Sequence, residues 1–351
     1  MMRESGSARS GMLCGAVVLL LLVPSICAPQ TDSEYARGIA AFRAGDYASA
    51  ADLFAKAEMA APGTTDALIY QAKSHIHLQN FSSSESALRR YIALHTDSHE
   101  ALYLLGFVLH RENKASESLE IYTKAAALKT PTGEDFKIVG LDYVLLNDYA
   151  NAIKWLAKAV ELEPKNKDAW YYLGRAYYSK SLLRESRRAF LTVLDLDPRD
   201  AKAENSLGLI LESEAKPDEA MEAYRKAMEW QAGGAHRSEQ PYLNLGNLLL
   251  ELDRTGEAIA PLEEAAQLAP DNGSCHLKLG TAYLRANRLL EAQRELEKAK
   301  QLEPENAAIH YQLARVYKQT RQMDKAKIEF QWTEELQSRA ARTRPSDPPE
   351  P

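Results

Sequence analysis

The residues of this chain that could bind a metal and that cluster most closely in the sequence are histidines. Five of the eight histidines fall between residues 75 and 110: His75, His77, His95, His99 and His110. A metal site needs three or four ligands that converge on one point, and no cysteine lies near these histidines in the sequence. The cluster is therefore a candidate only if the fold brings its members together.

No other residues are spaced for catalysis. Cys275 and His276 are adjacent, and neighbours on a helix point in different directions, so packing is the simpler interpretation. The chain contains no Gly-rich phosphate loop, His-Glu-x-x-His pair or nucleophile elbow where a fold would support one. We therefore predict no catalytic residue, metal or cofactor, and the chain is not expected to be an enzyme.

Composition narrows the possible partners. The 351 residues are 45% hydrophobic and 26% charged, as is typical of a folded protein. The net charge of -6 gives no overall attraction to nucleic acid, which is not an expected partner. Three cysteines are too few for a disulfide framework.

Residues 1–30 have the pattern of a secretory signal. Arg3 and Arg9 precede the apolar run of residues 12–23, and small residues follow it. The run is shorter than the roughly 20 apolar residues of a membrane span. We expect export to the periplasm or secretion. The alternative is an N-terminal anchor, uncleaved or lipidated at Cys27, which would be the only membrane contact.

A 34-residue period governs the rest of the chain. Units start at residues 31, 65, 99, 133, 167, 201, 239, 273 and 307. Position 8 of each unit is small: Gly38, Ala72, Gly106, Gly140, Gly174, Gly208, Gly246, Gly280 and Ala314. Position 24 is large and apolar: Phe54, Leu88, Tyr122, Leu156, Phe190, Tyr224, Leu262, Leu296 and Phe330. We expect two helices to touch at position 8, with the residue at position 24 filling the space beside them.

The ends of the units carry helix stop and start signals. Proline occupies position 32 in five units, whereas Thr96, Thr130 and Ala232 replace it, so these joints are expected to be looser. Position 34 carries residues that favour a helix N-cap: Thr64, Ser98, Thr132, Asn166, Asp200, Gly234, Asn272 and Asn306. Acids at position 2 of the first five units suit the positive end of the helix dipole.

Residues 170–177, followed by Ser186, Phe190 and Pro198, resemble the tetratricopeptide repeat. The resemblance covers residues 31–340 and implies an all-α, right-handed superhelical solenoid of about nine helix-turn-helix units, whose first helices line a concave groove. Residues 235–238 are an insertion that either bends the solenoid or forms a surface loop. The tail, residues 341–351, contains four prolines and is expected to be disordered.

In such repeats, positions 5, 9, 12 and 13 usually face the groove. In the first five units these positions hold basic and aromatic residues and no acid. The predicted protein-binding residues are Tyr35, Phe42, Arg43, Lys73, Tyr103, Phe107, Arg111, Lys137, Tyr171, Arg175 and Tyr178. They suit an extended partner segment with acidic and apolar residues. The alternative is that the tyrosines pack between neighbouring units.

The same alignment bears on the histidines and on function. His77 and His110 are expected to project towards the groove, whereas His95 and His99 flank a turn, so they are not expected to share a metal. The predicted function is an exported scaffold or adaptor that binds proteins through its concave groove. The alternative is a non-catalytic accessory subunit of a cell-envelope enzyme or of an export or assembly machine.

Overall fold

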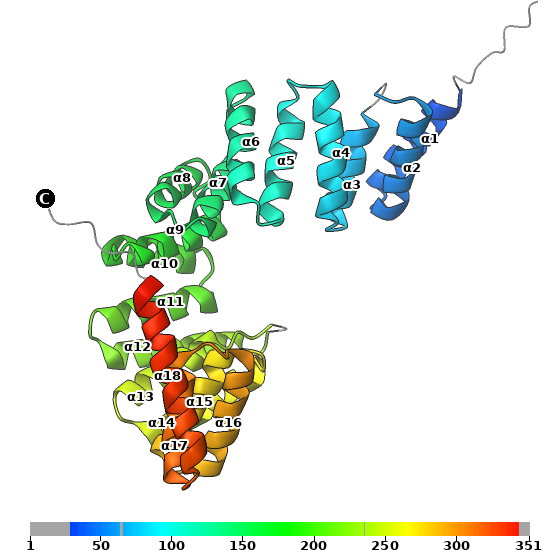
Figure 1. Cartoon of the computed structure of the whole chain (residues 1–351). Helices are drawn as coiled ribbons and strands as arrows, with labels where there is room; N and C mark the ends of the chain where they lie inside the picture. Colours follow the sequence, from blue (N-terminus) through cyan, green and yellow to red (C-terminus); the bar gives the residue numbers. More distant parts are fainter. Residues whose placement is uncertain (1–28, 64–65, 235, 344–351) are drawn as a thin grey trace, which may run out of the picture. The chain divides into compact units, whose positions relative to one another are not determined.

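The computed structural model describes residues 29–63, 66–234 and 236–343. The expected signal up to residue 28, with Cys27, and the tail beyond residue 343 lie outside these residues. All regular structure in the described part is helical, in 18 helices, which confirms the predicted all-α class (Figure 1). None of these helices has the length and hydrophobicity that a membrane span requires.

The chain divides into two compact units after Thr96, which is one of the joints without proline. The helices of the first unit are α1 (Pro29–Arg43), α2 (Tyr47–Ala60), α3 (Ala67–His77) and α4 (Phe81–Leu94). The second unit begins with α5 (His99–Arg111), α6 (Ala115–Leu128), α7 (Gly133–Leu145), α8 (Tyr149–Leu162), α9 (Lys167–Ser179), α10 (Leu183–Leu196) and α11 (Ala201–Ser213). It continues with α12 (Pro217–Gln231), α13 (Gln240–Glu251), α14 (Thr255–Leu268), α15 (Gly273–Arg285), α16 (Leu289–Leu302), α17 (Ala307–Gln319) and α18 (Met323–Thr343).

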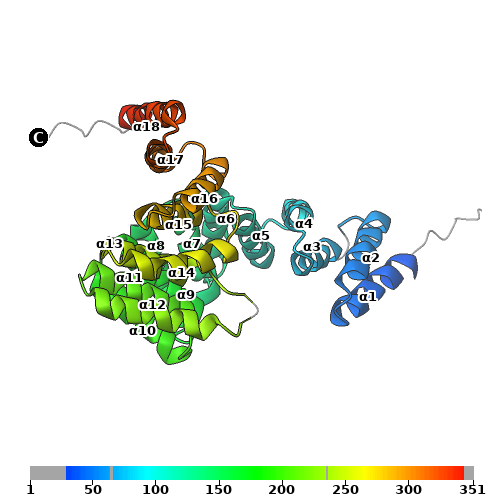
Figure 2. The ribbon, with the colours of Figure 1, turned by 90° about the horizontal axis from the view of Figure 1, so that it is seen from below.

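Each repeat is one pair of helices, an odd-numbered helix followed by an even-numbered one. In the second unit the pairs succeed one another, and the last pair, α17 and α18, packs against α16 (Figure 2). Helix α18 runs to Thr343, three residues past the predicted end of the repeats at residue 340.

The small residue at position 8 lies directly against the large residue at position 24, as predicted. A Cβ atom added to Gly174 would lie 2.9 Å from the Phe190 ring, and one added to Gly106 would lie 2.6 Å from the Tyr122 ring. Where position 20 is serine, its hydroxyl adds a hydrogen bond to the same contact, as when Ser186 Oγ donates to the Gly174 carbonyl at 2.8 Å. The two helices of a repeat are therefore locked together within the repeat itself.

The turn inside each repeat uses one residue in the left-handed conformation, always at position 15. Glycine fills this position only in the first repeat, as Gly45 with φ of 80°. Later repeats place other residues there, with φ between 57° and 61°: Gln79, Asn113, Asn147, Ser181, Ala215, Asp253, Asn287 and Arg321. A side chain in this conformation costs roughly 1 kcal/mol, less for asparagine.

The predicted N-caps are confirmed where position 34 immediately precedes a helix. Side chains accept a backbone hydrogen bond at Ser98, Thr132, Asn166, Asp200, Asn272 and Asn306. The prediction of Gly234 is wrong, because α13 begins after the insertion, with Glu239 at its N-cap. The Gln231 side chain closes this loop by hydrogen bonds to the Ser238 backbone, at 2.8 Å to its carbonyl and 2.9 Å from its N–H.

Position 4 of three repeats ties the new repeat to the end of the preceding one. The side chains of Trp170, His276 and His310 hydrogen bond to the proline carbonyls of Pro164, Pro270 and Pro304, at 2.9, 3.1 and 2.8 Å. Each bond satisfies the carbonyl of a proline that directly follows the C-cap of the preceding helix.

Candidate protein-binding site

Two adjoining cavities, of ≈ 280 and ≈ 450 Å³, lie along the first helices of the fifth, sixth and seventh repeats, α9, α11 and α13. Four residues line both: Tyr171, Arg175, Asn205 and Gln240. Tyr171 and Arg175 occupy positions 5 and 9, the face that the resemblance predicts for a groove. The cavities together form a candidate binding site, which we call the groove site.

The groove site carries two exposed positive charges. Arg175 lines both cavities and Lys202 lines the smaller one. Neither side chain forms an ion pair within the described residues. A guanidinium and an ammonium group without an internal counter-ion are available to a carboxylate from outside.

Asparagine side chains supply a polar contact at the floor of the site. Asn244 Nδ2 donates to Asn205 Oδ1 at 3.0 Å. This bond uses the side-chain oxygen of Asn205 and leaves the side-chain nitrogen of Asn205 as a donor. An amide donor beside two cations suits the backbone carbonyl of a bound segment.

The aromatic residues of the site are fixed by packing. The Tyr171 ring lies 5.7 Å from the Phe190 ring, and burial raises the pKa of Tyr171, against the opposing effects of Arg175 and Ser206. The Tyr178 and Ser213 hydroxyls lie 3.2 Å apart. Tyr178, Phe190 and Leu209 line the larger cavity, so it has an apolar wall beside its charged rim.

The first unit holds four of the predicted binding residues. Tyr35 packs on Phe54 and Tyr70, with ring centroids at 5.7 and 6.3 Å, and burial raises the pKa of Tyr35. Phe42 contacts Tyr70 at 5.6 Å, and Lys73 lies over the Tyr70 ring at 4.7 Å. The fourth, Arg43, is exposed.

The second unit holds the other seven, and Tyr171, Arg175 and Tyr178 come together in the groove site. The remaining four, Tyr103, Phe107, Arg111 and Lys137, do not line its two cavities. Lys137 pairs with Glu134 at 2.7 Å, and its side chain is only 14% exposed. Tyr103 donates to the Lys129 carbonyl at 2.6 Å and packs on Tyr122.

Several position-5 tyrosines therefore pack within their own repeat. Tyr35, Tyr103, Tyr171 and Tyr311 lie 5.7 to 6.2 Å from the position-24 rings of Phe54, Tyr122, Phe190 and Phe330. Packing thus accounts for much of their burial, mainly against their own repeat. Tyr35 also contacts Tyr70 of the next repeat, which agrees with the alternative from the sequence.

Lys202 and Gln240 line the site but were not among the predicted residues. Both occupy position 2, where the preceding repeats carry acids suited to the helix dipole. The change from Asp168 to Lys202 at this position is the sequence signal that could have found them. Positive charge at a helix start is unfavourable by itself, which suggests another role.

The histidines between residues 75 and 110 take separate positions. His77 stacks on Tyr47 at 4.0 Å, and His95 contacts Tyr91 at 4.3 Å. His110 Nδ1 lies 2.7 Å from Asp142 Oδ1, and Asp142 is fully buried. Across the described ranges, no group of three or more potential ligands is arranged to hold a metal.

The chain is a helical repeat protein, because pairs of helices follow one another along it. The first helices of three pairs line a surface of the kind that binds proteins. Profiles described as tetratricopeptide repeat match residues 70–131, 140–181, 181–234, 239–272 and 277–331. The chain belongs to the tetratricopeptide repeat family, which confirms the resemblance seen in the sequence.

Several known proteins are similar in sequence to part of this chain. A TPR repeat-containing protein of Methanocaldococcus jannaschii is 26% identical over 175 residues, covering 46% of this chain and 30% of the relative. The type IV pilus assembly protein PilF of Pseudomonas aeruginosa is 31% identical over 101 residues, covering 29% and 38%. The chain thus spans less than half the length of these curated relatives.

Solved structures show the same fold. A tetratricopeptide repeat protein from Parabacteroides merdae has a TM-score of 0.58 at 16% identity, covering 71% of this chain and 97% of that one. The anaphase-promoting complex assembly Cut9–Hcn1 has a TM-score of 0.58 at 15% identity, covering 77% and 52%. The predicted solenoid fold is confirmed.

Proposed function

We propose that this protein is an exported scaffold that binds an extended segment of a partner protein in the groove site. The observation that carries this proposal is the pair of cations, Arg175 and Lys202, that line the cavities without an internal counter-ion. Stacked repeats form extended concave surfaces that bind other proteins, which supports a binding role over a catalytic one.

The chemistry of the site specifies the segment. A carboxylate would pair with Arg175 and Lys202, and a backbone carbonyl would accept from the Asn205 amide. An apolar side chain would pack on Tyr178 and Leu209 in the larger cavity. An extended segment fits because the two cavities adjoin along three successive first helices.

Export is proposed from the sequence of residues 1–30, whose basic start and short apolar run match a secretory signal. A second candidate function follows from the 31% identity to a type IV pilus assembly protein over 101 residues. In that case the chain would be an accessory subunit of an envelope assembly machine, and the groove site would hold another subunit.

Affinity capture from envelope extract, read by mass spectrometry, tests the groove site. The purified chain is compared with an Arg175→Glu, Lys202→Glu variant. A second variant, Lys124→Glu with Lys327→Glu, makes the same charge change at exposed lysines outside the site. We expect a partner recovered by the wild type and the control variant to be lost with the groove variant.

Two results would contradict the proposal. Recovery of the same partners by all three proteins would remove the groove site as the binding surface. Loss with both variants would show that the total charge, not the site, governs capture. Melting temperatures that agree among the three proteins exclude unfolding as the cause of any loss.

A further inference from the structure

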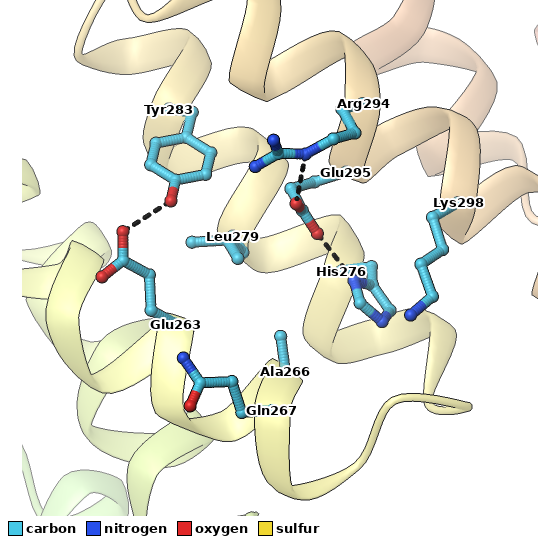
Figure 3. A pocket seen from close by; sticks show the side chains of 9 residues that line it. All are labelled: Glu263, Ala266, Gln267, His276, Leu279, Tyr283, Arg294, Glu295 and Lys298. Carbon is cyan, nitrogen blue, oxygen red and sulfur yellow. Dashed lines mark hydrogen bonds and ion pairs between the residues drawn. The ribbon is translucent and has the colours of Figure 1, made fainter.

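A cavity of ≈ 510 Å³ lies between α14, α15 and α16, away from the groove site (Figure 3). Its walls carry charged and polar side chains from all three helices: Glu263, His276, Tyr283, Arg294, Glu295 and Lys298. Leu279 and Ala266 supply an apolar floor. We call this cavity the outer site, because second helices of two successive repeats form its sides.

The outer site uses a different helix face from the groove site. His276, Leu279 and Tyr283 occupy positions 4, 7 and 11 of their repeat. At 100° per residue, these positions point at least about 80° away from positions 5, 9 and 12, which line the groove site. A ligand in one site therefore does not occupy the other.

The acids of the outer site already have partners inside the protein. Tyr283 donates to Glu263 Oε1 at 2.5 Å. Glu295 receives His276 Nδ1 at 2.8 Å and Arg294 Nε at 3.1 Å, as the dashed lines in Figure 3 show. Both carboxylates are thus already hydrogen bonded inside the protein.

The donors of the site are only partly used. Arg294 spends its Nε on Glu295, and its side chain is 71% exposed, so the two terminal nitrogens remain. Lys298, one turn further along α16, forms no ion pair within the described residues. In Figure 3 the Lys298 side chain ends beside the His276 ring, and the Arg294 guanidinium lies on the other side of the Glu295 carboxylate.

His276 is held between two acceptor oxygens. Its Nδ1 lies 2.8 Å from the Glu295 carboxylate and its Nε2 lies 3.1 Å from the Pro270 carbonyl. Both ring nitrogens are thus engaged within the protein, whereas Arg294 and Lys298 keep donors that are not bonded, which favours a ligand with acceptor oxygens.

We propose that the outer site binds an aspartate or glutamate side chain of a protein partner, independently of the groove site. The carboxylate pairs with Arg294 and Lys298, and an apolar neighbour in the partner packs on Leu279 and Ala266. Paired donors one helical turn apart hold a carboxylate more firmly than a single exposed cation does.

The chain contains a matched control for this proposal. Lys154 and Lys158 occupy positions 22 and 26 of the fourth repeat, as Arg294 and Lys298 do in the eighth. The cavity lined by Phe136 and Trp155, which stand where the outer site has His276 and Glu295, is ≈ 260 Å³ and apolar, and neither lysine lines it. Lys158 pairs instead with Glu161 at 3.0 Å, so the control changes two cations at equivalent positions outside both polar sites.

The experiment measures binding of a fluorescein-labelled peptide of alternating glutamate and leucine to the full chain by fluorescence anisotropy. An Arg175→Gln, Lys202→Gln background silences the groove site. Into this background we place either Arg294→Gln with Lys298→Gln, or the control pair Lys154→Gln with Lys158→Gln. A peptide of alternating glutamine and leucine tests the need for the carboxylate.

We expect the background protein to bind the acidic peptide and not the glutamine peptide. The Arg294→Gln, Lys298→Gln change should weaken binding at least about tenfold, as expected for loss of charge-assisted hydrogen bonds, and the control pair less than about twofold. Unchanged circular dichroism spectra and melting temperatures confirm that the variants fold.

Equal losses with both pairs would overturn the proposal in favour of general charge attraction. Absence of binding to the background protein would also overturn it, whether or not the wild type binds. If the background protein binds the acidic peptide with the same affinity as the wild type, the groove proposal fails while the outer site stands. The two failures are therefore distinguishable.

Discussion

The fourth and eighth repeats share the same contact between their two helices but carry different side chains beside it. Both contain glycine at position 8 and leucine at position 24, as Gly140 with Leu156 and Gly280 with Leu296. Outside this shared contact, the fourth repeat stacks Phe136 on Trp155 at 5.4 Å. The eighth places His276 and Glu295 at the same two positions, 2.8 Å apart.

The difference shows which positions define the fold and which are free to vary. The contact between positions 8 and 24 holds the two helices of a repeat at a fixed separation. Positions 4 and 23 then face each other at that separation, whatever their chemistry. An aromatic stack and a buried His–Glu hydrogen bond can therefore replace one another at these positions.

The largest expected effect tests the shared contact. Gly140→Leu and Gly280→Leu should each lower stability by about 3 kcal/mol, because a Cβ at either glycine would already lie 2.6 Å from the leucine Cγ. Thermal unfolding followed by circular dichroism measures both. A large loss in one repeat and none in the other would refute the equivalence of the two regions.

The next effect separates the two chemistries. His276→Phe alone should cost about 2 kcal/mol, because it leaves the largely buried Glu295 with the exposed Arg294 as its remaining partner. His276→Phe with Glu295→Trp copies the fourth repeat and should restore most of that loss. Denaturant unfolding of the two variants decides the point, and a double variant worse than the single one would show that the backbones differ.

Acid should weaken the contact between positions 4 and 23 in the eighth repeat and not in the fourth, where both residues are aromatic. The hydrogen bond from His276 lowers the pKa of Glu295 below 4.5. A lowered folded-state pKa stabilises the protein above the unfolded value and is lost as pH falls through the folded one. Hydrogen exchange below pH 4.5 should therefore speed up in α15 and α16 before α7 and α8, whereas equal acceleration would count against this assignment.

The smallest effect concerns a feature that both repeats share. Asn147 and Asn287 occupy position 15 with φ of 57° and 58°. Replacing either by alanine should cost about 1 kcal/mol, because alanine tolerates the left-handed conformation less well than asparagine. Equal shifts in denaturation midpoint are expected, and a stabilising change at either position would contradict the shared turn geometry.

The period of 34 residues was enough to predict the helix pairs, their contact and six N-caps. These features depend on residues within one repeat, so a single sequence reveals them. Gly234 failed as an N-cap because an insertion separates it from its helix, and periodicity cannot say where an interrupted repeat resumes its helix.

The groove site was predicted less completely. Tyr171, Arg175 and Tyr178 were found from their positions, but Lys202 and Gln240 were not. Lys137 was also predicted from its position, and the structure pairs its charge with Glu134 three residues earlier. Which cations remain available depends on side-chain pairs, and the spacing of residues does not determine these.

The pairing of Tyr283 with Glu263 recurs one repeat later, where Tyr317 donates to Glu297 at 2.8 Å. His310 and Glu329 likewise reproduce His276 and Glu295, at 2.6 Å. The eighth repeat thus presents to its successor the same acid that it receives from its predecessor. A copy of this repeat inserted beside the original would match both neighbours, so this end of the chain is a module that gene duplication could lengthen without new contacts.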